Sequence, residues 1–399
     1  MCRRSGLWPD AESVHRSAVT KGRKKIPWQV FEEILEDAVD LAYELWPQGA
    51  QDDEYNWNGK AVYAFDGAKF LLPATPEIRN AFDPDSGLGN EGKGHYPHCL
   101  VTTAYDVFRR MPVGRVISPC DSSEREVVQP LIPKIPGGNL LLFDSGYPGF
   151  EFFEYLNAHY QGDYLFRSPA TRTFNAVQEF IRSQKKEDVI SITPPTSYIY
   201  RSETDAQRQE RKNTAPIRLR VIRLEEPDGT LSVLLTSLLD WKKYPAEEII
   251  ELYFKRWEIE TFYRHEKTYI QLEQFHSRSV NGILQEFFAS LIVSVIAVAL
   301  TVIVSGTGNK DQNKRPLGKS IVRFQFKNAV VAVAAEAAFL ASRDPARAIE
   351  ILVDLLEDIR RVKYYKPKVS RRMQPRVSLK PTNKWTLRKQ KRLDGEYDA

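Results

Sequence analysis

The apolar positions of the chain predict a set of short strands interleaved with helices. From Trp28 to Trp46 the apolar residues recur with a helical period, and Pro47 ends that helix. Apolar runs typical of strands occupy 61–73, 100–108, 113–118 and 139–144. The first of them is either a strand pair bent at Asp66-Gly67 or one long strand with a bulge. A Ser N-cap opens a predicted helix over 122–135. This order favours an α/β fold with a mixed sheet and helices on both of its faces.

The pattern changes over 181–240, where alternating and apolar runs predict a small β-rich insertion. Pro245 then begins one long predicted helix that reaches Ile270, and further helices are predicted over 281–304 and 328–362. These changes divide the chain into five parts. They are a short N-terminal helical region (1–58), the first part of a core (59–180), the β-rich insertion (181–240), the second part of the core (241–305), and a C-terminal helical region with a basic tail (306–399).

The segment 287–304 contains 18 residues without a charge, which is near the lower limit for a membrane span. A helix buried on all sides of a large core requires the same composition. We favour the buried helix and no membrane partner, because the segment is the only one of its kind and an amphipathic helix runs directly into it.

Composition places the chain among ordered, intracellular proteins. Its 399 residues are 42% hydrophobic, and its three cysteines are widely spaced. An odd, scattered set of cysteines suits the reducing cytoplasm and offers no disulfide framework. The net charge of +5 is modest, but 360–392 holds 14 Lys or Arg and no Asp or Glu. A run of this kind favours binding to a polyanion such as DNA, although a solvated tail has the same composition.

Four polar side chains of the predicted 245–270 helix share one stripe. At 100° per residue, Tyr253, Arg256, Glu260 and Lys267 fall within about 60° of one another. Taken alone, the stripe is also what an exposed helix face with ion pairs four residues apart would give.

Two aspartates give the stripe a chemical context. Asp66 and Asp144 each lie at or near the end of an apolar strand, with a glycine within two residues. Singly each fits a turn, but carboxylates at the rim of an α/β sheet lie where ligands usually bind. Together with Glu260 they would offer two hard cations the oxygen ligands that these ions prefer. Two such ions can catalyse phosphodiester chemistry, and Arg256 and Lys267 would then contact the phosphates.

The string Tyr253-x2-Arg256-x3-Glu260-x6-Lys267 resembles the Tyr-Arg-Glu-Lys signature of bacterial insertion-sequence DDE transposases. FDG at 65–67 and FDSGYPG at 143–149 resemble the first- and second-aspartate motifs of that group. The resemblance covers about 60–305. It implies a ribonuclease-H-like fold with a β-rich insertion between the second Asp and the Glu. It also implies catalysis and metal binding by Asp66, Asp144 and Glu260, and DNA binding by Tyr253, Arg256 and Lys267.

The same resemblance implies two Mg²⁺ ions, for which Mn²⁺ would substitute, and cut-and-paste transposition by cleavage at transposon ends and strand transfer. The implied partners are the terminal repeats, target DNA and a second copy of the chain, in the bacterial cytoplasm at the nucleoid. The helical region before the first aspartate is shorter than in many members of the group. Two alternatives therefore stay open: a truncated or domesticated, inactive DNA-binding protein, and a two-metal nuclease without strand transfer.

Overall fold

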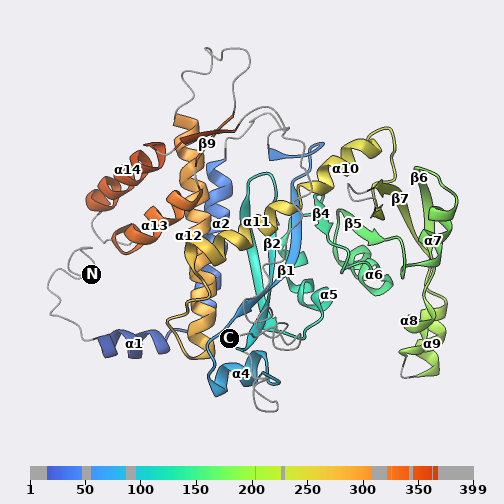
Figure 1. The fold of residues 1–399 in the computed structure, drawn as a ribbon, viewed down its shortest axis with the longest axis horizontal. Coiled ribbons are helices and arrows are strands. Elements are labelled where there is room, and N and C mark those ends of the chain that lie inside the picture. The colour runs from blue at the N-terminus through green and yellow to red at the C-terminus, as the bar shows by residue number, and fades with distance from the viewer. Residues whose placement is uncertain are drawn as a thin grey trace, which may run out of the picture.

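The fold is built on one sheet of eight strands (Figure 1). The computed structural model describes residues 16–46, 55–86, 96–202, 204–225, 230–307, 321–324, 326–340, 345–361 and 363–366. The strands lie in the order β3-β2-β1-β4-β5-β8-β7-β6. Their bounds are β1 Val62–Leu71, β2 His98–Asp106, β3 Met111–Pro119, β4 Leu140–Phe143, β5 Asp163–Pro169, β6 Glu187–Ile192, β7 Ile217–Glu225 and β8 Leu231–Thr236. A separate pair is formed by β9 Ile321–Phe324 and β10 Lys363–Lys366.

The sheet is mixed, as the sequence predicted. Strands β1, β2 and β3 form an antiparallel meander, while β4 and β5 run parallel to β1. This mixed sheet with flanking helices is consistent with a ribonuclease-H-like fold. Strands β8, β7 and β6 are all joined by antiparallel pairing and continue the same sheet from β5. The β-rich segment thus extends the core sheet rather than forming one of its own.

Alternation along the strands separates two cores. Val62 and Ala64 of β1 belong to one apolar cluster, and Tyr63 and Phe65 belong to the other. All four residues of β4 are buried, as expected for a strand that is covered on both faces.

Helices cover both faces of the sheet (Figure 1). The first face packs against α2 Gln29–Leu45, α10 Ala246–Phe254, α11 Trp257–His265 and α12 Val280–Thr307. The second packs against the 3₁₀ helix η1 Gln129–Lys134, α6 Phe150–His159 and α7 Asn175–Arg182. The other helices are α1 Arg16–Lys24, α4 Pro76–Phe82, α5 Glu124–Val127, α8 Thr196–Tyr200, α9 Asp205–Lys212, α13 Phe326–Leu340 and α14 Pro345–Arg361.

The apolar segment 287–304 lies within α12. Residues of α12 pack on α2 and the sheet on one side and on α13 and α14 on the other. Among the described helices α12 alone is long and apolar enough to cross a membrane, with a mean hydropathy of 2.8. Because 61% of its most apolar window is buried inside the protein, it equally meets the description of a core helix.

The prediction of one helix from Pro245 to Ile270 is wrong. Helix α10 ends at Phe254, α11 begins at Trp257, and a π-helical turn, η2 Glu266–Ile270, follows α11. The side chain of Glu266 is fully buried and forms an ion pair with buried Arg115 of β3. This tertiary contact lies at the start of η2, where the chain leaves the regular 3.6-residue period.

Two smaller differences from the predicted elements concern β1 and the segment 122–135. Strand β1 runs straight through Asp66 and Gly67, which pair in register with Thr103 and Thr102 without a bulge. The helix predicted over 122–135 is two short pieces, α5 and η1. In the N-terminal region a further helix, α1, precedes α2. Most of the basic run, residues 362 and 367–392, lies outside the described residues.

Candidate active site

The register of β1 and β4 places Asp66 beside Asp144. Parallel pairing begins at Val62 opposite Leu140 and continues to Phe65 opposite Phe143. The two aspartates are the next residues on the two chains, just beyond the last pair. Since successive side chains alternate between faces, Asp66 lies on the Ala64 side, which is the face covered by α10 and α11.

Glu260 reaches this place from α11. Ile259, Phe262 and Tyr263 of the helix are buried against the sheet, so that Glu260 stays at the margin of the buried face. The Tyr263 hydroxyl donates a hydrogen bond to the Asp66 carbonyl at 2.7 Å and lies 3.1 Å from the Val101 carbonyl. The helix that carries Glu260 is therefore joined directly to the backbone of the first aspartate.

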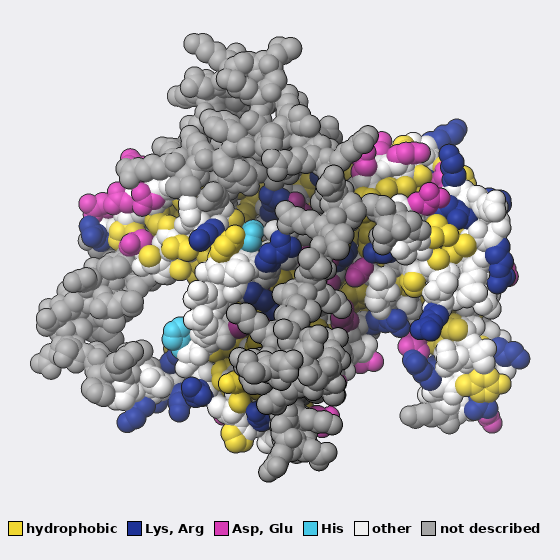
Figure 2. All heavy atoms as spheres, viewed as in Figure 1, with side chains coloured by type: hydrophobic (Ala, Val, Ile, Leu, Met, Phe, Trp, Pro, Cys, Tyr) yellow, Lys and Arg dark blue, Asp and Glu magenta, His cyan; other side chains and the backbone are white. Residues whose placement is uncertain are grey.

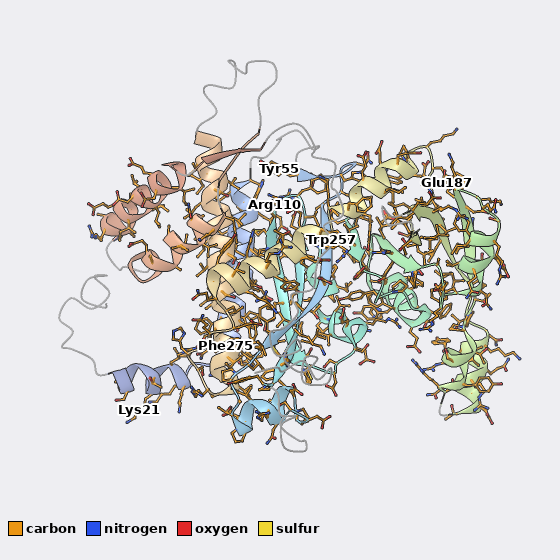
Figure 3. All side chains as sticks on the ribbon, viewed as in Figure 1. Lys21, Tyr55, Arg110, Glu187, Trp257 and Phe275 are labelled. Carbon is orange, nitrogen blue, oxygen red and sulfur yellow. The ribbon has the colours of Figure 1, made fainter. Side chains whose placement is uncertain are left out.

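A second contact holds α11 at its other end. Arg110, in the turn between β2 and β3, forms an ion pair with Glu258 at the start of α11. Figure 3 labels Arg110 close to Trp257, the first residue of that helix. Together the two contacts fix the orientation of the helix across the sheet.

Arg256 lies at the centre of the three carboxylates. Its Nη2 is 2.9 Å from Glu260 Oε1 and 3.8 Å from Asp144 Oδ1, and its Nη1 is 3.7 Å from Asp66 Oδ1. The arginine is only 2% exposed. Its Nε and Nη1 have no hydrogen-bond partner in the described part of the chain. One buried cation thus faces three carboxylates and keeps donors that are not saturated.

The three carboxylates carry more negative charge than one guanidinium balances. Burial raises the pKa of Asp66 to about 7, Arg256 opposes the shift, and the charges of Glu260, Asp144 and Glu124 add to it. Asp144 and Glu260 are more open, with side chains 35% and 31% exposed. The excess of negative charge at a solvent-accessible rim is an arrangement that attracts cations.

The structure brings two further residues of the predicted stripe to this cluster and separates one from it. The Tyr253 hydroxyl lies 3.4 Å from Asp144 Oδ1, and the Arg256 guanidinium lies near its ring. Lys267, beyond the break at η2, instead donates to the Lys69 carbonyl at 2.5 Å and forms an ion pair with Glu273 at 3.2 Å. The stripe that a regular helix would give therefore does not extend to Lys267.

The donor set fits divalent cations, but the side chains surround an arginine instead. Three carboxylates are the oxygen ligands that Mg²⁺ and Mn²⁺ prefer. In the described residues, however, no group of three or more His, Cys, Asp or Glu is close enough together to hold an ion. Arg256 stands between them, so ion binding requires its guanidinium to withdraw.

Two residues that border the site carry no signal in the sequence pattern. Glu124, at the start of α5, is near enough for its charge to raise the pKa of Asp66. Tyr147, in the loop after Asp144, is fully buried, and burial followed by the charges of Glu124 and Asp66 raises its pKa well above the usual range. Nothing in the local pattern marks Glu124, because its closeness to Asp66 arises from packing of α5 on β1.

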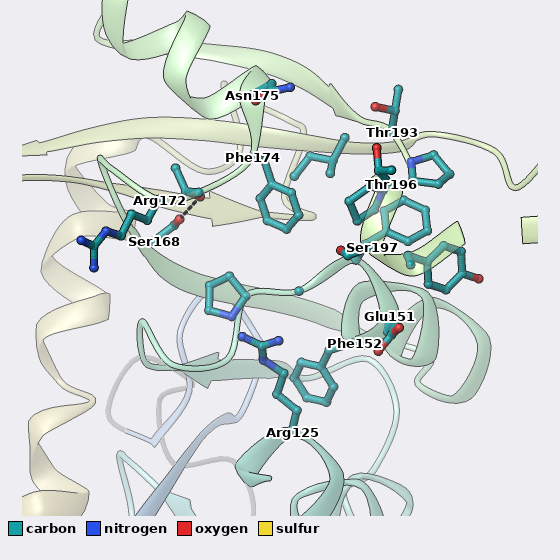
Figure 4. Close-up of a pocket in the computed structure, with 18 of the residues that line it drawn as sticks. Arg125, Glu151, Phe152, Ser168, Arg172, Phe174, Asn175, Thr193, Thr196 and Ser197 are labelled. Atoms are coloured by element: carbon teal, nitrogen blue, oxygen red, sulfur yellow. Dashed lines mark hydrogen bonds between the residues drawn. The ribbon is translucent and has the colours of Figure 1, made fainter. Parts of the chain in front are cut away.

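A cavity of about 930 Å³ adjoins the loop of the second aspartate, although none of the three carboxylates lines it. Its wall includes Ser145, which follows Asp144, and Arg125, which follows Glu124. Figure 4 shows Arg125 on one side of this cavity and Phe174 and Thr196 across it. The cavity is thus shared by the loop of the second aspartate and the segment 168–201 that leads into and through the β-rich region.

Basic side chains lie on parts of the surface that are distant in sequence. Figure 2 shows them on α1 at the lower left and near α8 and α9 at the lower right. Helix α1 carries Lys21, Arg23 and Lys24, and α9 carries Arg208, Arg211 and Lys212.

Residues 57–296, more than half of the chain, match the family model described as Transposase DDE domain. The chain belongs to this family. The match spans all of the residues that approach Arg256, and it confirms the predicted membership in the DDE transposases.

Two curated Escherichia coli relatives support this membership in the DDE family. The chain is 25% identical over 268 residues to Transposase InsG for insertion sequence element IS4, covering 66% of this chain and 55% of InsG. It is 26% identical over 148 residues to InsZ, also named as a transposase, covering 36% of this chain and 47% of InsZ. The chain therefore spans about half the length of the curated relatives it matches.

Among solved structures, the chain resembles a piggyBac transposase synaptic complex with hairpin DNA. The TM-score is 0.39 at 11% identity, covering 78% of this chain and 58% of that one. At this level the similarity adds nothing to the argument from the fold and the family.

Proposed function

We propose that this DDE transposase cleaves phosphodiester bonds at transposon ends and joins the freed ends to target DNA, with Asp66, Asp144 and Glu260 as the catalytic, metal-binding residues. The observation that carries the proposal is the meeting of three carboxylates, from β1, from the end of β4 and from α11, around one buried cation. The ions would be two Mg²⁺, with Mn²⁺ as a substitute.

Two divalent ions bound there would activate the attacking oxygen and stabilise the leaving oxygen of an in-line displacement. In the first step, water attacks phosphorus and the bond to the 3′ oxygen of the transposon end breaks. In the second, that 3′ hydroxyl attacks a phosphodiester of the target, whose own 3′ oxygen leaves. The same carboxylates serve both steps, because each is a displacement at phosphorus.

Arg256 has two roles in this scheme. Without ions its guanidinium offsets the charge of the three carboxylates. When ions replace it, the guanidinium moves to the phosphate beside the scissile bond, where its unpartnered Nε and Nη1 can donate to phosphate oxygens. The hydroxyl of Tyr253 orients the Asp144 carboxylate, and in this scheme Tyr253 lies where the DNA strand reaches the site.

Lys267 contributes to DNA binding from a neighbouring position. Its ammonium group lies over the ring of Phe70, four residues beyond Asp66 on β1. A duplex that passes along β1 from the carboxylates would meet this charge next, so Lys267 contacts a phosphate further from the scissile bond than Arg256 does.

The partners follow from the same chemistry. The name of InsG assigns that relative to an insertion sequence, and we extend this to terminal repeats and target DNA for the present chain. We propose a homodimer when two ends are paired, with the 181–240 segment and the basic residues of 360–392 as additional DNA contacts. The protein would act in the bacterial cytoplasm at the nucleoid.

The test is end cleavage on a short duplex that carries the inverted repeat found beside the gene. In Mg²⁺ we expect cleavage at the repeat end and joining to a plasmid, and Glu260→Gln should abolish both while retaining DNA binding. Glu251→Gln is the matched control, since Glu251 is exposed on α10. Binding without any cleavage would instead indicate an inactive DNA-binding protein, and cleavage without joining would indicate a nuclease.

A further inference from the structure

The hydroxyl of Tyr263 reaches the main chain of the strand that carries the first aspartate. It donates to the Asp66 carbonyl at 2.7 Å and lies 3.1 Å from the Val101 carbonyl. Val101 belongs to β2, where it pairs with Ala68 of β1, so the hydroxyl lies over both strands beside Asp66. Side chains alternate along a strand, and position 67 points to the other face, which leaves the backbone here open to α11.

The same tyrosine moves with the helix that carries the third carboxylate. Glu260 precedes Tyr263 by three residues in α11, so the two side chains lie on neighbouring turns. The carboxylates of Asp66 and Glu260 both approach Arg256, at 3.7 and 2.9 Å. One buried hydrogen bond therefore joins the main chain of the first carboxylate residue to the helix of the other, across the gap in which an ion would bind.

A second contact holds the chain one turn later. Glu266, three residues after Tyr263, is fully buried and pairs with Arg115 of β3. The Nε of Arg115 donates to the Thr103 hydroxyl at 3.1 Å, and Thr103 lies opposite Asp66 in the sheet. Both contacts thus end on the strands around the first aspartate, so the helix cannot shift along the sheet without breaking them.

The surroundings of the Tyr263 hydroxyl keep it a hydrogen-bond donor. Burial, followed by the charge of Asp66, raises the pKa of Tyr263 far above its usual range, so the hydroxyl keeps its proton. Its acceptors are main-chain carbonyls, which leaves both carboxylate oxygens of Asp66 available to ions. A buried donor on the backbone of a ligand residue can orient that residue without touching the ion.

We propose that Tyr263 is a positioning residue of the cation site, whose hydroxyl sets the separation at which the Asp66 and Glu260 carboxylates share a divalent ion. The inference rests on the proposed function, because it requires both carboxylates to be metal ligands. Mg²⁺ demands near-octahedral geometry with oxygens at about 2.0–2.1 Å, so a small displacement of one carboxylate weakens binding. The hydroxyl itself touches neither the ion nor the DNA.

The experiment measures Mn²⁺ binding to the full chain by electron paramagnetic resonance, in which free and bound Mn²⁺ are distinguished. Tyr263→Phe removes only the hydroxyl, and we expect about tenfold weaker binding, as is typical when a group that orients a metal ligand is altered. Tyr164→Phe is the matched control, since this buried hydroxyl donates to Asn157 at 2.9 Å in the cluster on the other face of the sheet.

The control separates positioning from a loss of stability. Each variant loses one buried hydrogen bond, so both should show a similar, small drop in thermal unfolding midpoint, and binding is measured below both midpoints. Tyr164→Phe should nevertheless bind Mn²⁺ like the unaltered chain. An equal loss of Mn²⁺ binding in the two variants would refute the positioning role.

A double-mutant comparison tests the route of the effect. If Tyr263 acts through the placement of Glu260, Tyr263→Phe should no longer weaken Mn²⁺ binding in a chain that already carries Glu260→Gln. The same tenfold loss in both backgrounds would show that the hydroxyl acts independently of Glu260, and the proposal would be wrong.

Asp66→Asn distinguishes this proposal from the proposed site. If Asp66→Asn loses Mn²⁺ binding while Tyr263→Phe binds as tightly as the unaltered chain, the role of Tyr263 is refuted and the proposed site stands. If Asp66→Asn binds Mn²⁺ as the unaltered chain does, the proposed site and the role of Tyr263 are both refuted.

Discussion

Two arginines, Arg115 and Arg256, are equally buried but differ in the number of carboxylates that they face. Each is 2% exposed. Arg115 faces one carboxylate: its Nη2 donates to Glu266 at 2.5 Å, its Nε donates to Thr103, and Ser290 donates to the other Glu266 oxygen. Arg256 faces three carboxylates, at 2.9, 3.7 and 3.8 Å, two of which are about one-third exposed.

The difference separates a closed structural pair from an open site. A fully desolvated one-to-one ion pair cannot exchange either member for an ion from solvent. Removing either member leaves a buried charge without a partner. Three carboxylates around one cation at a solvent-accessible rim can exchange that cation for others. The same kind of contact thus closes a buried pair at Arg115, whereas at Arg256 it leaves an open cluster that we propose as the catalytic site.

The largest effect on folding is expected at the closed pair. Glu266→Ala leaves Arg115 buried without its carboxylate and should lower the free energy of unfolding by about 3–5 kcal/mol. The measurement is urea unfolding of the full chain. Arg115→Met combined with Glu266→Leu should recover much of this loss, because it removes both charges. A loss below about 1 kcal/mol for Glu266→Ala would show that the pair is not the closed structural contact described above.

At the open site, removal of the buried arginine charge should tighten the binding of divalent ions. Arg256→Gln removes the cation that competes with Mn²⁺. Two unit charges about 4 Å apart interact by about 4 kcal/mol at an effective dielectric constant of 20. Because Asp144 and Glu260 are partly solvated, we expect much less, about a tenfold gain in Mn²⁺ affinity. Cleavage should nevertheless fall, since the phosphate contact is lost.

Lys255→Gln is the control for this variant. Lys255 adjoins Arg256, but its ammonium lies over the ring of Phe108 at 5.2 Å. Its Mn²⁺ affinity should equal that of the unaltered chain. Equal or weaker Mn²⁺ binding by Arg256→Gln would contradict the idea that the guanidinium occupies the place of an ion.

The smallest effect is expected at Lys267. Its contacts with Lys69 and Glu273 place it apart from the carboxylates, so Lys267→Ala should leave Mn²⁺ affinity unchanged. We expect it to reduce end cleavage less than Arg256→Ala does and more than Lys255→Ala does. Cleavage assays on the same end substrate compare the three variants. Equal defects in all three would show that only the positive charge of this region matters, and not the position of each side chain.

Local sequence was sufficient to predict the strands and the family, but not how the site is assembled. Asp66 and Asp144 could be selected because each follows an apolar run, and the parallel register then makes them neighbours. The stripe to Lys267 failed because η2 interrupts the helix where Glu266 pairs with Arg115, 151 residues away. No local signal predicts such a contact.

Gly67 illustrates the same limit. A glycine after an aspartate is typical of a turn, so the sequence alone also allows a bend there. In the structure the strand continues, and the glycine instead admits Glu124 from a segment 57 positions later. Its role depends on the packing of α5, which the pattern of β1 alone does not contain.

The central claim, that Asp66, Asp144 and Glu260 hold divalent ions together, is tested most directly by iron-directed cleavage of the polypeptide. Fe²⁺ bound in place of Mg²⁺ generates hydroxyl radicals on addition of ascorbate and peroxide, and these cut the chain near the bound ion. The account predicts cuts close to 66, 144 and 260, lost in excess Mg²⁺ and absent from Asp144→Ala. Cuts that cluster elsewhere, or cuts at these three places that persist in Asp144→Ala, would contradict it.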